Sequence, residues 1–339
     1  MTTLKDISML AGVSLSTVSR TLSGSCNVDP ELRQRVLAAA KQLDYTPNLA
    51  ARSLRTRSTR LIGMISEGNT NYMFSNLINH ISDQCTDLGY CLIVANHHND
   101  PEREELIFSS MRQRGVDGLI LSLVSKESNI IPRVVESDIP VVIFDRYLIF
   151  DQLSMGENNY SITLDNYQAG QMAAEFFLQQ GHKKIALAEG PKDVDLTRMR
   201  TTGFFDRLAG ADSFVPMPYR FSGGFEFEDG VRVARELTQF PEQQRPSAIW
   251  CQNDSMAAGL ISELHRFGLR IPEDLSVLGM DNIELSTLIY PSLSTIEQPF
   301  REMANVSVRM LLGRKTPFGK KAILSPRLLE RESTRPFSV

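Results

Sequence analysis

The chain has 339 residues, 42% of them hydrophobic and 22% charged, so it can bury sizeable cores, and its length predicts two or three domains. No apolar run approaches the roughly 18 residues of a membrane-spanning helix, and the first residues lack the apolar core of a secretion signal, which predicts a cytoplasmic protein. The four cysteines are scattered without a Cys-x-x-Cys pair, so we expect reduced thiols rather than a disulfide or zinc framework.

The net charge of −4 hides an uneven distribution along the chain. Residues 1–60 carry nine Lys and Arg against four Asp and Glu, whereas the remainder carries 27 against 36. A small basic segment joined to a larger acidic one is typical of a protein whose basic part meets phosphates. Chance clustering on a solvated face is the alternative.

Three short helices are predicted in the first 45 residues, over about 4–10, 14–22 and 29–43. The third starts at Asp29-Pro30, an acidic N-cap followed by a proline at the first helical position. The turn at Ala11-Gly12 joins the first two helices into a helix-turn-helix, whose second helix fits the major groove of DNA. The expected core consists of apolar residues at helical spacing, namely Ile7, Leu10, Val13, Val18, Val36, Ala39, Ala40 and Leu43.

The second predicted helix is rich in hydroxyl side chains and contains Arg20. Ser and Thr reach phosphates or base edges without crowding, and Arg binds phosphate or guanine. Residues 46–59 then read as a linker with weak helical character, since Pro47 can start a helix that Ala50, Ala51 and Leu54 support. So short a helix is unstable alone, and we expect it to form only when packed on a second copy or on DNA.

From residue 61 onward strands and helices alternate in two blocks. The first block has predicted strands at 61–66, 91–95, 118–123, 141–145 and 162–164, with helices at 74–88, 102–114 and 129–137. The second has strands at 185–189, 248–252 and 276–280, with helices at 167–180, 197–208, 227–239, 255–267 and 301–312. The predicted fold class is therefore α/β, with two similar subdomains of parallel sheet flanking a cleft, behind an all-α N-terminal domain.

Polar side chains follow three of these strands, as Asp145-Arg146, Asn253-Asp254 and Asp281-Asn282. Ligands bind at the carboxyl ends of parallel strands, and carboxylates, amides and guanidinium groups bracket sugar hydroxyls. Phe74 and Phe225 could supply apolar faces. For any single residue, capping of the following helix is an equally good interpretation.

Catalytic and cofactor motifs are not found in the sequence. The five histidines have no metal-binding spacing, and there is no nucleophile elbow, phosphate loop or dinucleotide fingerprint. We therefore expect no enzyme activity, no metal and no cofactor. Two other classes of protein predict different features. A solute-binding protein would carry a secretion signal and no DNA-binding head, and an α/β enzyme with an accessory DNA domain would carry a catalytic motif.

The order of landmarks along the chain resembles the lactose-repressor/galactose-repressor (LacI/GalR) family of bacterial transcription regulators over essentially its whole length. The resemblance is carried by Lys5-Asp6-Ile7, Thr17-Val18-Ser19-Arg20, Leu43-Asp44-Tyr45-Thr46-Pro47-Asn48, Ala51-Arg52-Ser53-Leu54, Gly181-His182-Lys183-Lys184-Ile185, Asn253-Asp254-Ser255-Met256-Ala257 and Ile271-Pro272-Glu273-Asp274.

The resemblance implies a DNA-binding head (1–45), a hinge or linker (46–59) and an effector-binding and dimerisation domain (60–339) similar to type I periplasmic binding proteins. The N-subdomain would comprise about 60–161 and 292–321, and the C-subdomain about 162–290 and 322–335. A homodimer would bind a pseudo-palindromic operator under control of a sugar, glycoside or sugar phosphate in the cleft. Whether the effector acts as inducer or corepressor stays open.

The resemblance also implies site residues. DNA contacts are implied for Thr3, Leu15, Ser16, Thr17, Ser19, Arg20, Asn27, Tyr45, Asn48, Ala51 and Leu54. Leu15 and Ser16 fall at the base-reading start of the recognition helix, and Leu54 falls where the family wedges a side chain into the minor groove. The effector positions are Phe74, Asp145, Arg146, Arg200, Phe225, Asn253 and Asp281. One departure is Leu15, which is apolar where some members carry a hydrogen-bonding aromatic residue.

Overall fold

A computed structural model describes residues 2–22, 28–46, 53, 56, 58–68, 72–125, 128–145, 157–211 and 219–337. Contacts divide the chain into two compact units, Met1–Thr59 and Arg60–Val339. Five predicted site residues lie outside the described residues, namely Asn27, Asn48, Ala51, Leu54 and Arg146. Within the described ranges, no helix combines the length and the apolar character needed to cross a bilayer.

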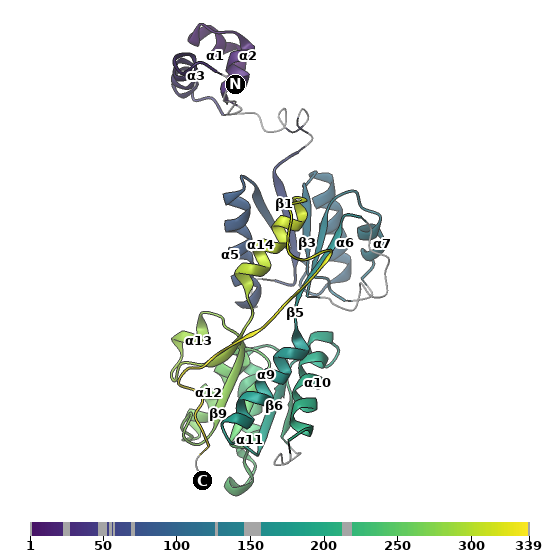
Figure 1. The fold of residues 1–339 in the computed structure, drawn as a ribbon, viewed down its shortest axis with the longest axis vertical. Coiled ribbons are helices and arrows are strands. Elements are labelled where there is room, and N and C mark those ends of the chain that lie inside the picture. Colours follow the sequence, from purple (N-terminus) through teal and green to yellow (C-terminus); the bar gives the residue numbers. More distant parts are fainter. Residues whose placement is uncertain are drawn as a thin grey trace. The chain divides into compact units, whose positions relative to one another are not determined.

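The first unit contains helices α1 (Leu4–Ala11), α2 (Leu15–Leu22) and α3 (Pro30–Gln42), shown in Figure 1. The Asp29 side chain caps α3 by accepting hydrogen bonds from the backbone N–H groups of Glu31 and Leu32, as predicted. Gly12 ends α1 in the left-handed conformation (φ 63°), which a glycine adopts without strain and which turns the chain into α2.

The buried core of this unit is formed by Ile7, Ala11, Val18, Val36 and Ala39. Val13, Ala40 and Leu43 pack against it while partly exposed, in agreement with the predicted set. The prediction for Leu10 is wrong, because this side chain is 47% exposed. Ile7 and Ala11, one turn apart, define the buried stripe of α1 and leave Leu10 on its flank.

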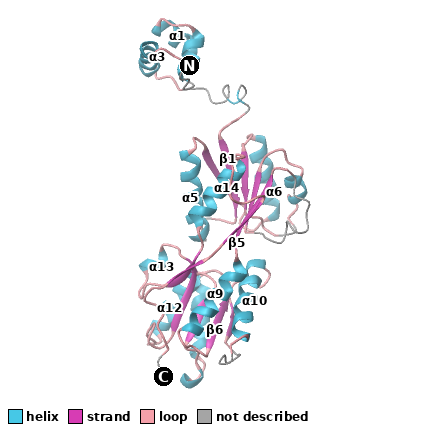
Figure 2. Cartoon of the chain, in the orientation of Figure 1, coloured by secondary structure: helices cyan, strands magenta, loops and turns pink. Residues whose placement is uncertain are grey.

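The second unit contains two six-stranded sheets. The first has the order β11-β5-β4-β3-β1-β2, with all neighbours parallel, and belongs to what we call the N-subdomain. Helices α5 (Tyr72–Asp87) and α14 (Phe300–Leu311) cover one face, and α6 (Pro101–Gln113) and α7 (Ile131–Val135) cover the other (Figures 1 and 2). The strands are β1 (Leu61–Ser66), β2 (Cys91–Asn96), β3 (Gly118–Leu121), β4 (Val141–Phe144), β5 (Asn159–Leu164) and β11 (Lys321–Leu324).

The sheet of the C-subdomain has the order β12-β10-β9-β8-β6-β7 and is parallel except for its edge strand β12. Helices α9 (Asn166–Gln179) and α10 (Asp195–Ala209) pack on one face, and α11 (Phe227–Thr238) and α12 (Asp254–Arg266) pack on the other. The strands are β6 (Ile185–Glu189), β7 (Arg220–Ser222), β8 (Ala248–Cys251), β9 (Ser276–Asp281), β10 (Ser294–Glu297) and β12 (Arg327–Leu329). Short helices lie at Glu242–Gln244 and, as α13, at Leu285–Leu288. Apart from the edge strand β12, both sheets are thus parallel, and both are covered on both faces, which confirms the predicted fold class.

Three connections pass between the two sheets, and strand pairing places them a few residues later than the predicted positions near 161, 291 and 322. The strand β5 pairs with β4 and β11 of the N-subdomain as far as Leu164. The strand β10 pairs with β9 of the C-subdomain as far as Glu297, and β11 stays with β5 as far as Leu324. These boundaries were implied by the resemblance, and the observed ends follow from the backbone pairing of Ser294–Glu297 with β9 and of Lys321–Leu324 with β5.

Helices α9 and α10 approach each other through a reciprocal pair of glycines. A Cβ atom added to Gly170 would lie 2.0 Å from the backbone oxygen of Arg200, and one added to Gly203 would lie 2.0 Å from that of Tyr167. Backbone therefore packs on backbone, and no side chain can be inserted without separating the two helices. Because α10 carries Arg200, this packing also sets the depth of that side chain.

We expect Gly170→Ala to lower the free energy of unfolding by about 1–3 kcal/mol, since the added methyl group meets a rigid backbone oxygen. Equilibrium denaturation in urea measures this loss. Gly210→Ala, at the end of α10, is the matched control because its Cβ would meet its nearest neighbour at 3.7 Å. Equal stability of the Gly170→Ala variant and the wild type would contradict the close-packing argument.

Candidate functional site

A cavity of about 420 Å³ lies between the two subdomains. Its lining combines residues that follow β1, β4, β8 and β9 with residues from α5, α10 and the segment between β7 and α11. Six of the seven residues predicted to contact an effector line this cavity, namely Phe74, Asp145, Arg200, Phe225, Asn253 and Asp281. We call this cavity the cleft.

Two carboxylates of the cleft stand on unusual backbone. Asp145 directly follows β4 with φ 61°, and Asp281 ends β9 with φ 112°. Non-glycine residues in this region are uncommon, are held there only by the surrounding structure, and cluster at ligand sites. The bend that ends each strand turns the side chain toward the cleft instead of back into the sheet.

Arg200 lies at the base of the cleft and is only 3% exposed. Its Nε donates to Oδ1 of Asn166 at 2.8 Å, and its Nη1 donates to the backbone oxygen of Gln252 at 3.0 Å. Burial lowers the pKa of the guanidinium, while the charges of Asp281 and Asp145 raise it. These two carboxylates therefore compensate the buried cation from the cleft side.

Asp281 is 5% exposed and accepts a hydrogen bond from Nε2 of Gln298 at 2.6 Å. Burial raises the pKa of its carboxyl group to about 7, against the lowering effects of Arg200 and of the Gln298 hydrogen bond. A carboxyl group with this pKa changes charge near neutrality, so its ionisation state is sensitive to whatever occupies the cleft.

The two interpretations of Asn253, capping and ligand binding, do not exclude each other. Its Oδ1 accepts a hydrogen bond from Met256 N at 2.9 Å, which makes it the N-cap of α12. Its Nδ2 donates to the backbone oxygen of Phe225 at 2.7 Å, and the residue also lines the cleft. Asp254, proposed as a cap, is instead the first residue of the helix and accepts from Ile283 N and from the Thr295 hydroxyl at 2.9 and 2.6 Å.

Sequence reasoning missed five polar residues that also line the cleft: Glu67, Asn99, Ser122, Asp193 and Gln298. The first three share the signal that found the others, since each follows a parallel strand. His97 links two of them. Its Nε2 lies 2.9 Å from the backbone oxygen of Ser122, and its Nδ1 accepts a hydrogen bond from Asn99 N at 3.0 Å.

The ring of Phe225 packs directly over Gly190. A Cβ at Gly190 would lie 2.3 Å from Cε1 of Phe225, so only a glycine at the end of β6 lets the ring occupy this place. We expect Gly190→Ala to displace the ring and weaken effector binding about tenfold, with little loss of stability because a side chain can move where backbone cannot. Calorimetric titration and urea denaturation measure the two effects, and Gly319→Ala, with no neighbour within 4 Å, serves as the control. Unchanged affinity would show that Phe225 does not contact the effector.

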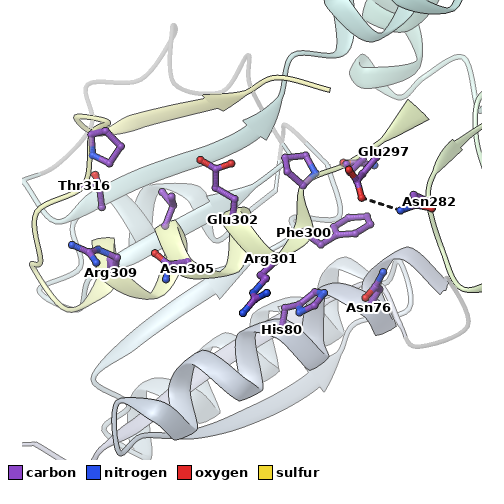
Figure 3. A pocket seen from close by; sticks show the side chains of 14 residues that line it. Asn76, His80, Asn282, Glu297, Phe300, Arg301, Glu302, Asn305, Arg309 and Thr316 are labelled. Carbon is purple, nitrogen blue, oxygen red and sulfur yellow. Dashed lines mark hydrogen bonds between the residues drawn. The ribbon is translucent and has the colours of Figure 1, made fainter. Parts of the chain in front are cut away.

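A larger cavity of about 760 Å³ lies between α5 and α14 of the N-subdomain (Figure 3). Figure 3 shows Arg301 extending from α14 toward α5, which carries His80 and Asn76. Acidic and basic side chains both line this cavity, and none of the predicted effector residues does. It shares Gln298 with the cleft. Its mixed charge favours no particular class of ligand.

Five predicted DNA-contacting residues lie on α2: Leu15, Ser16, Thr17, Ser19 and Arg20. Val18 and Thr21 are buried against the core of the head, whereas Leu15, Ser16 and Arg20 are exposed. This arrangement leaves the start and the outer face of α2 accessible to a partner.

The two remaining predicted DNA contacts in the described part of the head have structural tasks as well. Thr3 caps α1, and its hydroxyl donates to Oδ2 of Asp6 at 2.8 Å. Tyr45 follows α3 and packs, partly buried, against the core. Its backbone N–H donates to the Ala40 oxygen at 2.9 Å.

Comparisons with known proteins give the same two-part division. Residues 3–48 match the family model of bacterial regulatory proteins of the lacI family, and residues 174–334 match that of the periplasmic binding protein-like domain. The HTH-type transcriptional repressor PurR of Klebsiella pneumoniae (strain 342) is 33% identical over 98% of this chain and 97% of its own length. The ribose operon repressor of Escherichia coli (strain K12) is 32% identical over 98% of this chain and all of its own.

Among solved structures, the lac repressor dimer bound to operator and the anti-inducer ONPF superposes with a TM-score of 0.81 at 26% identity. The match covers 98% of this chain and 99% of that one. Two repressors thus share about a third of their residues with this chain from end to end, and a third repressor shares its fold. The chain belongs to the lacI family of bacterial regulatory proteins.

Proposed function

We propose that this chain is a homodimeric transcriptional repressor that binds operator DNA through α2 and changes its operator affinity when a small polyol occupies the cleft. The observation that carries the proposal is the convergence of six predicted residues, from segments up to two hundred positions apart, on one cavity between the subdomains. The relatives support the DNA-binding part, since the lac repressor structure contains a dimer on its operator.

The chemistry of the cleft favours a ligand rich in hydroxyl groups. Four carboxylates line it, those of Glu67, Asp145, Asp193 and Asp281, and ionised carboxylates only accept hydrogen bonds. A ligand with hydrogen-bond donors, as sugar hydroxyls are, suits the ionised carboxylates, and a hydroxyl can also accept a hydrogen bond from Asp281 in its protonated form. The apolar rings of Phe74 and Phe225 fit the C–H faces of a sugar ring.

The charge balance argues against the sugar phosphate that the sequence left open. Among the described lining residues the only cation is Arg200, and two of its donor groups already serve Asn166 and Gln252. The start of α10 lacks a side-chain cap and could attract an anion, but Asp193 and Asp195 stand beside it. A phosphate group would face several carboxylates, and repulsion between charges of the same sign is unfavourable.

A paired titration tests this assignment. Gel-shift assays use duplex DNA from beside the protein's own gene, with matched free and phosphorylated sugars, such as ribose and ribose 5-phosphate or glucose and glucose 6-phosphate. We expect wild-type protein to shift the DNA and at least one free sugar to change its affinity, typically by about 5- to 150-fold, while the phosphorylated partner does not. A response to the phosphates alone, or to no free sugar, would refute the polyol assignment.

The DNA-binding part has its own control. Arg20→Ala removes an exposed cation from α2 and should weaken operator binding while leaving effector binding and unfolding unchanged. An equal loss of all three would point to a misfolded variant, and no loss of DNA affinity would refute the role of α2.

We further propose that the chain is not an enzyme and acts in the cytoplasm, where operator DNA is found. The curated relatives support this proposal, since PurR and the ribose operon repressor are repressors.

A further inference from the structure

The first turn of α2 presents one apolar side chain to solvent. Leu15 is the first residue of the helix and is 52% exposed, although it lies one turn before Val18, which is fully buried. Helical spacing alone would place Leu15 on the buried side. Because α2 starts at this residue, the side chain projects beyond the core of the head.

The hydroxyl groups around Leu15 are engaged with one another. Oγ of Ser14 lies 2.8 Å from Oγ of Ser16 and 2.8 Å from Oγ1 of Thr17, and it also accepts a hydrogen bond from Thr17 N at 3.2 Å. This cluster caps the start of α2. Among the described residues of the head, the apolar cluster does not include Leu15, and about half of its side chain stays accessible to a partner.

Other apolar side chains of the head are exposed as well, but Leu15 is at the start of the helix expected to enter the major groove, where it can make an apolar contact with the DNA. The edges of the base pairs in the major groove carry hydrogen-bonding groups, with one apolar exception, the C5-methyl group of thymine. We propose that Leu15 reads the methyl group of a thymine in each operator half-site. This inference rests on the proposed DNA-binding function and adds the base that one side chain recognises.

The test removes only the methyl group. Operator duplexes are enriched from a random pool with the full-length protein, and each thymine is then replaced singly by deoxyuridine, which keeps all hydrogen-bonding groups. We expect one thymine per half-site at which the substitution weakens wild-type binding about fourfold, the value of one methyl group removed from water. Leu15→Ala should bind both duplexes equally, and Leu15→Met, which keeps an apolar side chain, should still prefer thymine.

Leu37→Ala is the matched control, because Leu37 is 50% exposed but lies on α3. This variant should retain the full preference for thymine. The proposal is overturned if no thymine methyl affects wild-type binding, or if Leu15→Ala keeps the wild-type preference. Failure to enrich any duplex would instead overturn the DNA-binding function itself, so the two failures are distinguishable.

Discussion

Replacing Arg200 with alanine should abolish effector binding and lower the free energy of unfolding by about 3–5 kcal/mol. The guanidinium is 3% exposed, and its removal leaves the Asn166 and Gln252 oxygens without their donor. It also leaves the carboxyl groups of Asp145 and Asp281 without the cation that interacts with both of them. A buried charge that loses its partner is costly, and without the guanidinium the two carboxyl groups must be protonated or remain as uncompensated buried charges.

Arg198→Ala provides the comparison on the same helix. Arg198 pairs with Asp195 one turn away at a side chain that is 52% exposed, where ion pairs contribute little. We expect Arg198→Ala to change the free energy of unfolding by less than about 1 kcal/mol and the effector affinity hardly at all. Urea denaturation and calorimetry with the free sugar found in the gel-shift assay measure both. Wild-type affinity in the Arg200→Ala variant would refute the placement of the effector against this side chain.

The second large effect is a pH dependence that originates at Asp281. Burial raises the pKa of its carboxyl group in the folded protein to about 7, well above the ordinary value of 3.8. The folded state therefore holds this proton more tightly than the unfolded chain does. The stability that this difference contributes is complete below about pH 4 and is lost as the pH rises through 7, a change of roughly 4 kcal/mol.

The Asp281→Asn variant isolates this contribution, since the amide cannot ionise. Relative to Asp281→Asn, the wild type should lose stability as the pH rises from about 4 to 7. Above that range the difference in free energy of unfolding should stay constant. Denaturation in urea at several pH values gives the difference directly. A constant difference across the range would show that the Asp281 carboxyl group does not titrate near neutrality.

Effector affinity should rise with pH over the range in which the stability falls. Hydroxyl donors on a polyol favour the ionised carboxylate, so binding lowers the pKa of Asp281 and releases its proton whenever the pH is below about 7. We expect affinity to rise with pH by up to tenfold per unit below pH 7 and to level off above it, while Asp281→Asn binds more weakly with a flat profile. Calorimetry in buffers of different ionisation enthalpy counts the released proton, and uptake of a proton on binding would contradict the model.

The sequence predicted much of the local structure, because the signals involved are local. Asp29-Pro30 marked the start of α3, and the apolar stretches of β1 and β6 matched the strands residue for residue. These elements are specified by caps, proline geometry and continuous buried runs, which depend only on neighbouring residues. The strands β7, β10, β11 and β12 were not predicted, since each has only three or four residues with a weak apolar signal, and only their neighbours in the sheets make them strands.

The same division holds within the cleft. The sequence predicted that Asp145, Asn253 and Asp281 lie at the ligand site, because they follow or end predicted parallel strands, whose carboxyl ends meet at one edge of a sheet. The sequence could not show that Gln298 reaches Asp281, because the connection after β10 brings together residues from different segments. Nor could it show that Arg200 is wholly buried, which the glycine contacts between α9 and α10 decide.

Spacing and chain order determined the helix-turn-helix, the two α/β blocks and the resemblance to a regulator, because periodic patterns and turn residues act within a few positions. The tertiary structure decided which polar groups share one cavity, which of them are buried and how their charges balance. Those properties depend on contacts between residues far apart in the chain, and they turn an open choice among sugar, glycoside and sugar phosphate into a proposal for an uncharged polyol.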